Sequence, residues 1–332
     1  MPHPAPTNPA TDLPGDPPRR GTVAALIKLA RPQQWAKSVF VLIGPFYGLR
    51  EAMHDTGLTW THAALQGLLA AAAFALASSA SYIVNDIADA DADRNHPRKR
   101  LRPLARGEVS KQTALSFAAG LLVVVALLLV MVGSGALTGL LIVYVVNVWL
   151  YSMRLKHIVV ADVISLSLGF VLRVLGGCAA LAISPSTWLL NVTLFLAMFL
   201  AFGKRLGERR TLGAADAVAA RGVQAAYSDA LLRMFLIATA VATLITYAGY
   251  VQAREPVASH HLWGERGAFN VLWFTLLPAT YAMLRSIVLV EHGRYDDPTE
   301  LAMKDVPTQL AALAFALLTG VSLAWGVLFG PK

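Results

Sequence analysis

Charged side chains are scarce in this 332-residue chain: they make up 14% of it, whereas hydrophobic residues make up 56%. A soluble domain usually carries about 25% charged residues, so this chain cannot cover a water-facing surface in the ordinary way. Several apolar stretches reach the roughly 20 residues that a helix needs to cross a bilayer. The composition therefore predicts an integral membrane protein.

Cysteine is almost absent too, since Cys178 is the only one. A single cysteine excludes a disulfide framework and a cysteine-based metal site within one chain. Because it lies in an apolar stretch, we expect it to be a small packing residue. The sequence also lacks a glycine-rich phosphate loop, a Ser–His–Asp order and a His-Glu-x-x-His motif, the usual signatures of nucleotide binding and hydrolysis.

The net charge of +8 and the pI near 9.7 raise the question of a nucleic-acid partner. No basic stripe is interleaved with exposed aromatic residues, which argues against nucleic acid. In so hydrophobic a chain, the basic residues are better explained as Lys and Arg kept at the cytoplasmic edge of the membrane.

Hydrophobic stretches predict an all-α fold with about nine transmembrane helices. Residues 1–22 contain seven prolines and are expected to be a disordered tail. No apolar segment with a cleavage site follows directly, so the tail is not a signal peptide. Residues 23–332 form one expected domain, with helices at 34–50, 62–84, 113–133, 135–152, 159–182, 187–204, 230–252, 268–290 and 308–329.

Lys and Arg gather before the first expected helix and in every second connection after it, most densely between Arg94 and Lys111. By the positive-inside rule, the N-terminus is cytoplasmic and the C-terminus lies outside the bacterial inner membrane. The connections at 133–135 and 184–186 carry no charge. All polar-rich connections then fall on the cytoplasmic side, which predicts a single catalytic face there.

An acidic run ends the second expected helix and contains Asp86, Asp89, Asp91 and Asp93, preceded by Asn85. At about 100° per residue, Asp89 and Asp93 fall about 60° and 20° from Asp86, and Asn85 falls about 100° away on the same side. Asp91 falls about 140° away, on the other side. Three carboxylates on one stripe repel each other unless a cation lies among them. Mg²⁺ fits best, because it prefers oxygen ligands and is often shared with substrate phosphates. The alternative is a solvated acidic loop.

The basic stretch that follows offers two interpretations. It either contacts lipid headgroups, as the positive-inside rule alone predicts, or it holds the phosphates of a substrate. For the second role the candidates are Arg94, Lys99 and Arg102.

The acidic run and the basic stretch after it resemble the first Asp-rich motif of the UbiA-type intramembrane prenyltransferases. The resemblance implies the fold of that family, nine helices around a central cavity. The resemblance covers about residues 24 to 328. Shorter stretches resemble one branch, the decaprenyl-phosphate phosphoribosyltransferases, whose members include a rhizobial relative associated with arabinosylation of nodulation signals. The matching stretches are Asn85–Arg94, His96-Pro97, Lys99–Leu104, Gly107–Ser110, Arg31–Lys37, Tyr151–Lys156, Gly169–Arg173, Phe202–Arg205 and Asp297–Leu301.

The family has a second Asp-rich motif before its last helix. In this chain that region offers two pairs, Asp297 with Glu300 and Asp296 with Glu300, and the spacing does not select one of them. Because this region departs from the Asp-x-x-x-Asp pattern, the sequence does not decide whether a second metal ion binds. The departure also weakens the case for a prenyl-diphosphate donor.

Further substrate-binding candidates lie near the expected helix ends. Lys37 follows Gln34 by three residues, so both can face one cavity, although Lys37 can also extend to the membrane edge. Tyr151 and Lys156 match a Tyr-and-Lys element of the family, and an interfacial Tyr is often only an anchor. Lys204, beside Arg205, either holds phosphate or follows from the positive-inside rule.

Arg173 lies deep in an apolar stretch, where a charge needs a polar cavity or a partner. It follows Asp162 by eleven residues, so the two lie within about 20° on one helix face. Substrate binding and an ion pair with another helix are both open for Arg173.

The resemblance implies transfer of 5-phosphoribose from phosphoribosyl diphosphate to a polyprenyl phosphate, with Mg²⁺ at Asp86, Asp89 and Asp93. Prenyl transfer to an aromatic acceptor is the second hypothesis. A transporter is the third, but it predicts charged or broken helices at mid-membrane, and here charge gathers at one edge apart from Arg173. Chain length of the lipid, the pathway served and the oligomeric state are not predicted.

Overall fold

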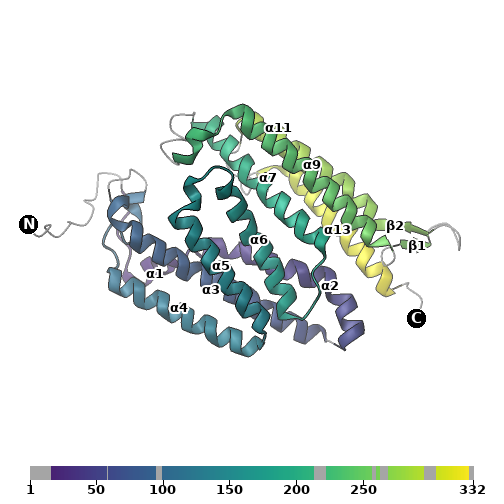
Figure 1. The fold of residues 1–332 in the computed structure, drawn as a ribbon, viewed down its shortest axis with the longest axis horizontal. Helices are drawn as coiled ribbons and strands as arrows, with labels where there is room; N and C mark the ends of the chain where they lie inside the picture. Colours follow the sequence, from purple (N-terminus) through teal and green to yellow (C-terminus); the bar gives the residue numbers. More distant parts are fainter. Residues whose placement is uncertain are drawn as a thin grey trace, which may run out of the picture. The chain divides into compact units, whose positions relative to one another are not determined.

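The structure is a computed structural model that describes residues 16–57, 59–94, 99–212, 222–255, 259–261, 268–294 and 304–328. This part of the chain is helical, apart from one short antiparallel hairpin of β1 (Ser259–His261) and β2 (Ala268–Asn270) (Figure 1). Seven of the described helices are long and apolar enough to cross a membrane, and a shorter apolar helix covers Val306–Ser322. The predicted all-α integral membrane fold is confirmed, while the count of nine and the central cavity stay predictions.

The chain divides into two compact units. The first unit runs to Ser152 and includes Leu172–Pro185, and the second is formed by Met153–Val171 and the chain from Ser186 onward. Helix α6 (Ala161–Ala180) contributes to both. The first unit also holds α1 (Thr22–Ala30), η1 (Pro32–Val39), α2 (Phe40–Thr56), α3 (Trp60–Asp93), η2 (Lys99–Leu101), α4 (Lys111–Val132) and α5 (Gly135–Met153). The second holds η3 (Leu155–His157), α7 (Thr187–Leu212), η4 (Gly222–Ala226), α9 (Asp229–Ala253), the hairpin, η5 (Val271–Thr275), α11 (Leu276–Glu291) and α13 (Val306–Leu328).

In the first unit, α3 and α4 lie side by side (Figure 1). The Ser110 hydroxyl accepts a hydrogen bond from the amide of Thr113 at 3.0 Å, which satisfies a free donor at the start of α4. Helix α4 ends at Gly133, whose φ of 71° suits a residue without a Cβ. A Cβ on Gly177 of α6 would lie 1.7 Å from the carbonyl oxygen of Val41 in α2. The two backbones therefore touch with no side chain between them.

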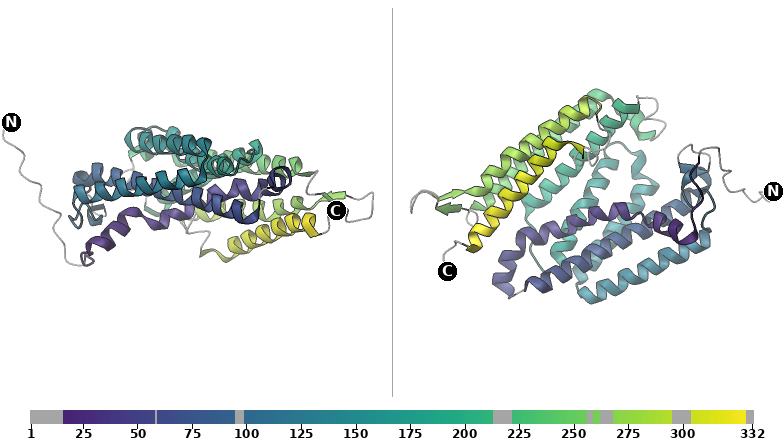
Figure 2. Two further views of the ribbon diagram at one scale, coloured as in Figure 1. Left: turned by 90° about the horizontal axis from the view of Figure 1, so that it is seen from below. Right: turned by 180° about the vertical axis from the view of Figure 1, so that it is seen from behind.

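In the second unit, α7 and α9 pack against each other around Phe202, Leu206, Leu232 and Leu236, all of them buried. Helix α9 begins where the Ser228 hydroxyl accepts a hydrogen bond from the amide of Leu231 at 3.1 Å. Helices α11 and α13 are neighbours, as Figure 2 shows. This packing brings the ends of α7, α9 and α11 together, where Arg210 of α7 and Arg233 of α9 both pair with Glu291 of α11.

Both uncharged turns are confirmed, since α4 gives way to α5 between Val132 and Gly135 and α6 gives way to α7 between Ala180 and Thr187. Several expected helix bounds were wrong: α2 continues from 50 to Thr56, α3 from 84 to Asp93 and α7 from 204 to Leu212, and residues 268–270 of the expected helix 268–290 form β2. Charge does not end α3 or α7, because charged side chains near their C-terminal ends form ion pairs. In α3, alanines between the aspartates also favour the helix.

Candidate active site

The acidic run forms the C-terminal end of α3, and two of its carboxylates share one arginine. Arg102 Nη1 donates to Asp86 Oδ1 at 3.2 Å and to Asp93 Oδ2 at 2.7 Å. The side chains of Asp86 and Asp93 are 3% and 6% exposed. The structure thus brings these two carboxylates to one side of α3, where the helical spacing places them.

The remaining members of the run have different partners. Asn85 Nδ2 donates to Asp89 Oδ2 at 3.1 Å, one turn further along the helix. Asp91 is exposed and pairs with Arg94 at 3.0 Å and with Lys111 at 2.9 Å. Arg94, a predicted phosphate ligand, therefore has an ion pair on the side of α3 that Asp91 occupies. Lys99 begins η2 and is half-buried.

Arg31 also contacts Asp86, and sequence reasoning did not select it. Its Nη2 donates to Asp86 Oδ1 at 2.6 Å, and its guanidinium carbon lies 4.8 Å from the centre of the Tyr82 ring. Arg31 has a φ of 51° and a ψ of 58°, the left-handed region that residues other than glycine seldom adopt. It is the first residue of the stretch that resembles the phosphoribosyltransferase branch, and this position was the signal that could have marked it.

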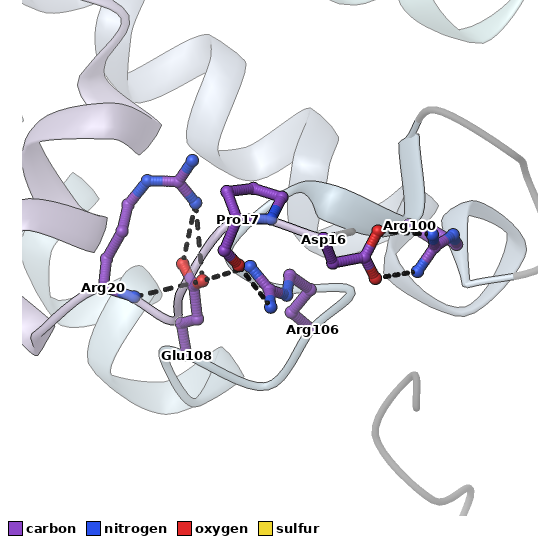
Figure 3. A network of polar contacts seen from close by, with 6 residues as sticks. All are labelled: Asp16, Pro17, Arg20, Arg100, Arg106 and Glu108. Carbon is purple, nitrogen blue, oxygen red and sulfur yellow. Dashed lines mark hydrogen bonds and ion pairs between the residues drawn. The ribbon is translucent and has the colours of Figure 1, made fainter. Parts of the chain in front are cut away.

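The turn before α4 is held by a buried carboxylate, that of Glu108 (Figure 3). Arg20 Nη1 donates to Glu108 Oε2 at 3.2 Å, and Arg106 Nη1 donates to Glu108 Oε1 at 3.3 Å. Arg106, itself buried, also donates to the carbonyl oxygen of Pro17 at 3.1 Å. The N-terminal segment that precedes α1 is therefore attached to the connection between α3 and α4.

A second contact fastens the same connection nearer to Arg102. The two terminal nitrogens of Arg100 each donate to a carboxylate oxygen of Asp16 at 2.6 Å (Figure 3). Within the turn, the amide of Arg106 donates to the carbonyl oxygen of Arg102 at 3.0 Å, and Gly107 supplies a φ of 73°. These contacts fix the backbone from which the Arg102 side chain reaches Asp86 and Asp93, which we call the acidic face of α3.

Gln34 and Lys37 both lie in η1, directly after Arg31. Gln34 is half-buried and Lys37 is exposed. In a 3₁₀-helix, residues three apart lie on the same side, so their expected common orientation fits the element that forms. Between them, Trp35 Nε1 donates to the Ser79 hydroxyl on α3 at 2.9 Å.

Arg173 is buried in the first unit among hydroxyl groups. Its Nη2 donates to the Tyr144 hydroxyl at 2.7 Å and to the Ser78 hydroxyl at 3.3 Å. Its guanidinium carbon also lies 4.6 Å from the centre of the Tyr144 ring, a cation–π distance. Both contacts are hydrogen bonds to hydroxyl oxygens, which orient the guanidinium group.

Asp162 is buried in the second unit, and its partner is Arg205 of α7. Asp162 Oδ2 and Arg205 Nη2 are 2.5 Å apart, with both side chains 1% exposed. The Tyr227 hydroxyl donates to Asp162 Oδ1 at 3.0 Å and accepts from the amide of Val160 at 2.7 Å. Burial raises the pKa of Tyr227, so its hydroxyl keeps its proton. Val160 has a φ of 67°, which is rare for a β-branched residue.

The other predicted residues are placed as follows. Tyr151 lies in the last turn of α5 and Lys156 in η3, both half-buried. Lys204 is half-buried within α7. The sequence had placed the end of this helix at Lys204, but the helix continues to Leu212. Asp297 and Glu300, and with them the predicted second acidic motif, lie outside the described residues.

Within the described residues, no three His, Cys, Asp or Glu side chains converge closely enough to form a metal site by themselves. The donor set on α3 nevertheless suits Mg²⁺, which usually binds one or two carboxylates and completes its coordination with water and substrate phosphates. Asp86 and Asp93 each place an oxygen against the same guanidinium nitrogen. They therefore fit an ion that is shared with a substrate.

Residues 52–304 match the sequence model of the UbiA prenyltransferase family. The chain belongs to this family. It is 32% identical to the decaprenyl-phosphate phosphoribosyltransferase of Mycolicibacterium smegmatis, over 92% of this chain and 94% of that protein. The enzyme of the same name from Mycobacterium tuberculosis H37Rv is 31% identical, over 93% of this chain and 97% of that protein.

A solved structure supports the fold. It is a UbiA homolog from Archaeoglobus fulgidus bound to GPP and Mg²⁺, with a TM-score of 0.62 and 18% identity over 91% of this chain and 98% of that one. At this identity the likeness concerns the fold. The resemblance that the sequence motifs predicted, to the family and to its phosphoribosyltransferase branch, is confirmed.

Proposed function

We propose that this protein transfers 5-phosphoribose from phosphoribosyl diphosphate to a polyprenyl phosphate. The observation that carries the proposal is the similarity to decaprenyl-phosphate phosphoribosyltransferases along almost the whole length of both chains. The buried carboxylates of Asp86 and Asp93, with arginines beside them, supply groups suited to a metal-bound diphosphate.

The reaction makes a bond between a phosphate oxygen of the lipid and the anomeric carbon of the ribose. The bond from that carbon to the diphosphate breaks, and its electron pair leaves with the diphosphate. The lipid phosphate is already ionised at neutral pH, so the reaction requires no protein nucleophile and no strong general base. Catalysis then consists of positioning the substrates and stabilising the charge that develops.

Asp86, Asp89 and Asp93 would hold Mg²⁺, with Asn85 beside them. The bound ion supplies a Lewis acid that stabilises negative charge on a leaving diphosphate. Arg102 and Lys99 bind phosphate oxygens, because a guanidinium and an ammonium donate charge-assisted hydrogen bonds to them. Asp297 and Glu300 are proposed as ligands of a second ion.

The remaining substrate contacts are proposed for the charged and polar residues that the sequence motifs single out. Arg173 is supported by its burial in an apolar helix, where a charged side chain is usually kept for a function. The others are Arg94, Gln34, Lys37, Tyr151, Lys156 and Lys204.

A bacterial inner membrane with the N-terminus in the cytoplasm is proposed from the distribution of Lys and Arg. Phosphoribosyl diphosphate is cytosolic, so its donor site must face that side. The product is proposed as a precursor of lipid-linked arabinose donors, for a cell wall or for a nodulation signal.

Prenyl transfer from a prenyl diphosphate to an aromatic acceptor is the second candidate. It is favoured by one observation, that the solved archaeal homologs carry the prenyl diphosphates GPP and DMAPP with Mg²⁺. These homologs are only 18% and 17% identical to this chain, and the phosphoribosyltransferases are closer in sequence.

An in vitro assay separates the two candidates. Purified protein, Mg²⁺, labelled phosphoribosyl diphosphate and a polyprenyl phosphate are expected to give a lipid-linked label. A parallel reaction contains a labelled prenyl diphosphate and an aromatic acid. Label in the aromatic product alone would reject phosphoribosyl transfer.

A further inference from the structure

The carboxylates of the acidic face are less accessible than the arginines that contact them. The side chains of Asp86 and Asp93 are 3% and 6% exposed, whereas those of Arg31 and Arg102 are 25% and 28% exposed. An anion that approaches this face meets guanidinium groups first. A cation can contact Asp86 only if it displaces a guanidinium group from that carboxylate.

Both guanidinium groups use the same oxygen of Asp86. Arg31 Nη2 lies 2.6 Å from Oδ1 and Arg102 Nη1 lies 3.2 Å from it. Arg102 has Asp93 as a second carboxylate partner at 2.7 Å. Arg31 and Arg102 therefore neutralise the face in the ligand-free protein, which is the role that Mg²⁺ would take when it binds.

The backbone holds Arg31 in this place at some conformational expense. Its left-handed conformation is one that residues other than glycine seldom adopt and that clusters at functional sites. The preceding carbonyl, that of Ala30, accepts a hydrogen bond from the Ser79 hydroxyl at 2.6 Å. Trp35, four residues after Arg31, donates to the same hydroxyl at 2.9 Å. Ser79 lies seven residues before Asp86, two turns along the same stripe of α3.

We propose that Arg31 is a further substrate-binding residue, which exchanges Asp86 for a phosphate oxygen when a metal diphosphate binds. The carboxylate that Arg31 releases would hold the metal, and Arg31 would donate to an oxygen of the diphosphate. This inference rests on the proposed function for the identity of the substrate. The exchange itself requires only a diphosphate and a divalent cation.

The exchange makes the binding of the metal ion and the binding of diphosphate cooperative. Without diphosphate, the metal must displace a guanidinium that then has no anionic partner, so the metal binds weakly. With diphosphate present, the displaced guanidinium gains a new anion. By linkage, the factor by which diphosphate strengthens metal binding equals the factor by which metal strengthens diphosphate binding.

Replacing Arg31 by glutamine separates this role from a purely structural one. In Arg31→Gln, Mn²⁺, which suits the same oxygen ligands as Mg²⁺, is expected to bind the ligand-free protein about fivefold more tightly, because its competitor is gone. Diphosphate with Mn²⁺ is expected to bind about tenfold more weakly, because a charge-assisted hydrogen bond is lost. A residue that only shapes the site would weaken both.

The experiment uses the full chain in detergent and measures bound radioactive Mn²⁺ alone, then bound labelled inorganic diphosphate with and without Mn²⁺, by equilibrium dialysis. Arg31→Lys keeps the charge and should keep most of the coupling. Arg233→Gln removes a more exposed arginine, paired with Glu291, and should change neither constant. Complex formation between Mn²⁺ and diphosphate in solution is the same for every variant and cancels in the comparison.

Weaker Mn²⁺ binding in Arg31→Gln, or unchanged coupling in it, would overturn the exchange. A thermal unfolding curve like that of the unmodified protein shows that the variant has folded. If it does not fold, Arg31→Lys decides: a single ammonium in place of the guanidinium should weaken the binding of diphosphate with Mn²⁺ measurably, and constants identical to those of the unmodified protein would overturn the exchange. Repeating the binding with phosphoribosyl diphosphate and with a prenyl diphosphate tests the substrate separately, since coupling with inorganic diphosphate does not depend on which is the donor.

Discussion

Asp91 pairs with Lys111 at 2.9 Å, on a side of α3 other than the one where Asp86 meets Arg31 and Arg102. This division predicts different outcomes for two equivalent substitutions. Asp86→Asn should lower kcat/KM at least about a hundredfold, because a lost metal ligand removes several kcal/mol of charge stabilisation. Asp91→Asn should stay within about threefold, as expected for an exposed pair. Steady-state rates at several Mg²⁺ concentrations give the comparison, and equal losses would refute the assignment of the face.

The buried carboxylate of Glu108 leads to a prediction about stability. Glu108→Gln removes the buried carboxylate that pairs with Arg106 and Arg20, so unfolding should become easier by about 3–5 kcal/mol. Glu291→Gln, which removes a partly exposed carboxylate, should change stability by less than about 1 kcal/mol. Chemical denaturation in detergent, followed by circular dichroism, measures both. The KM for phosphoribosyl diphosphate should also rise in Glu108→Gln, since the turn that carries Arg102 is loosened.

Tyr227→Phe should lower the stability of the second unit by about 1–3 kcal/mol. The substitution removes the hydrogen bonds of one hydroxyl, which donates to Asp162 and accepts from the Val160 amide and from Arg205 Nη1. Val160 then keeps its left-handed conformation without that support. Thermal unfolding monitors the loss, and a Tyr227→Phe protein as stable as the unmodified one would mean that this hydroxyl contributes nothing measurable.

Asp305 predicts how stability responds to acid. Hydrogen bonds from Arg285, whose Nε and Nη2 lie 2.6 and 2.8 Å from the carboxylate, hold the pKa of Asp305 well below its ordinary value of 3.8. A lowered folded-state pKa means that the contribution is present above pH 3.8 and is lost as the pH falls further. Asp305→Asn should therefore be less stable at neutral pH and show a flatter decline below about pH 4. Melting temperatures between pH 7 and pH 2.5 test this.

The sequence predicted the face that Asp86 and Asp93 share, because helical spacing alone fixes the direction of each side chain. It did not predict that Arg31 reaches Asp86 from 55 residues away. Such a contact depends on how α1 and η1 return to α3. Spacing was also insufficient for Asp162 and Arg173: their common direction on α6 does not reveal what neighbouring helices present, and each has a different partner.

The helix ends at α3 and α7 show the same limit. Dense charge usually marks the edge of an apolar span, so the sequence placed both ends too early. Arg205 and Asp93 remain helical because each has a partner from another element. Pairing of this kind is a tertiary property, and local propensity does not contain it.

The attachment of the N-terminal segment to the turn before α4 has a consequence for biogenesis. In the part of the chain that the structure describes, the ion pairs of Asp86 and Asp93 and those of the turn before α4 lie within about the first third of the sequence. Their members are Asp16, Arg20, Arg31, Asp86, Asp93, Arg100, Arg102, Arg106 and Glu108. Chains generally fold from the N-terminus during synthesis. The carboxylates at the membrane edge can therefore be compensated while the ribosome is still making the remaining helices, and the insertion machinery need not hold an unpaired acidic segment until translation ends.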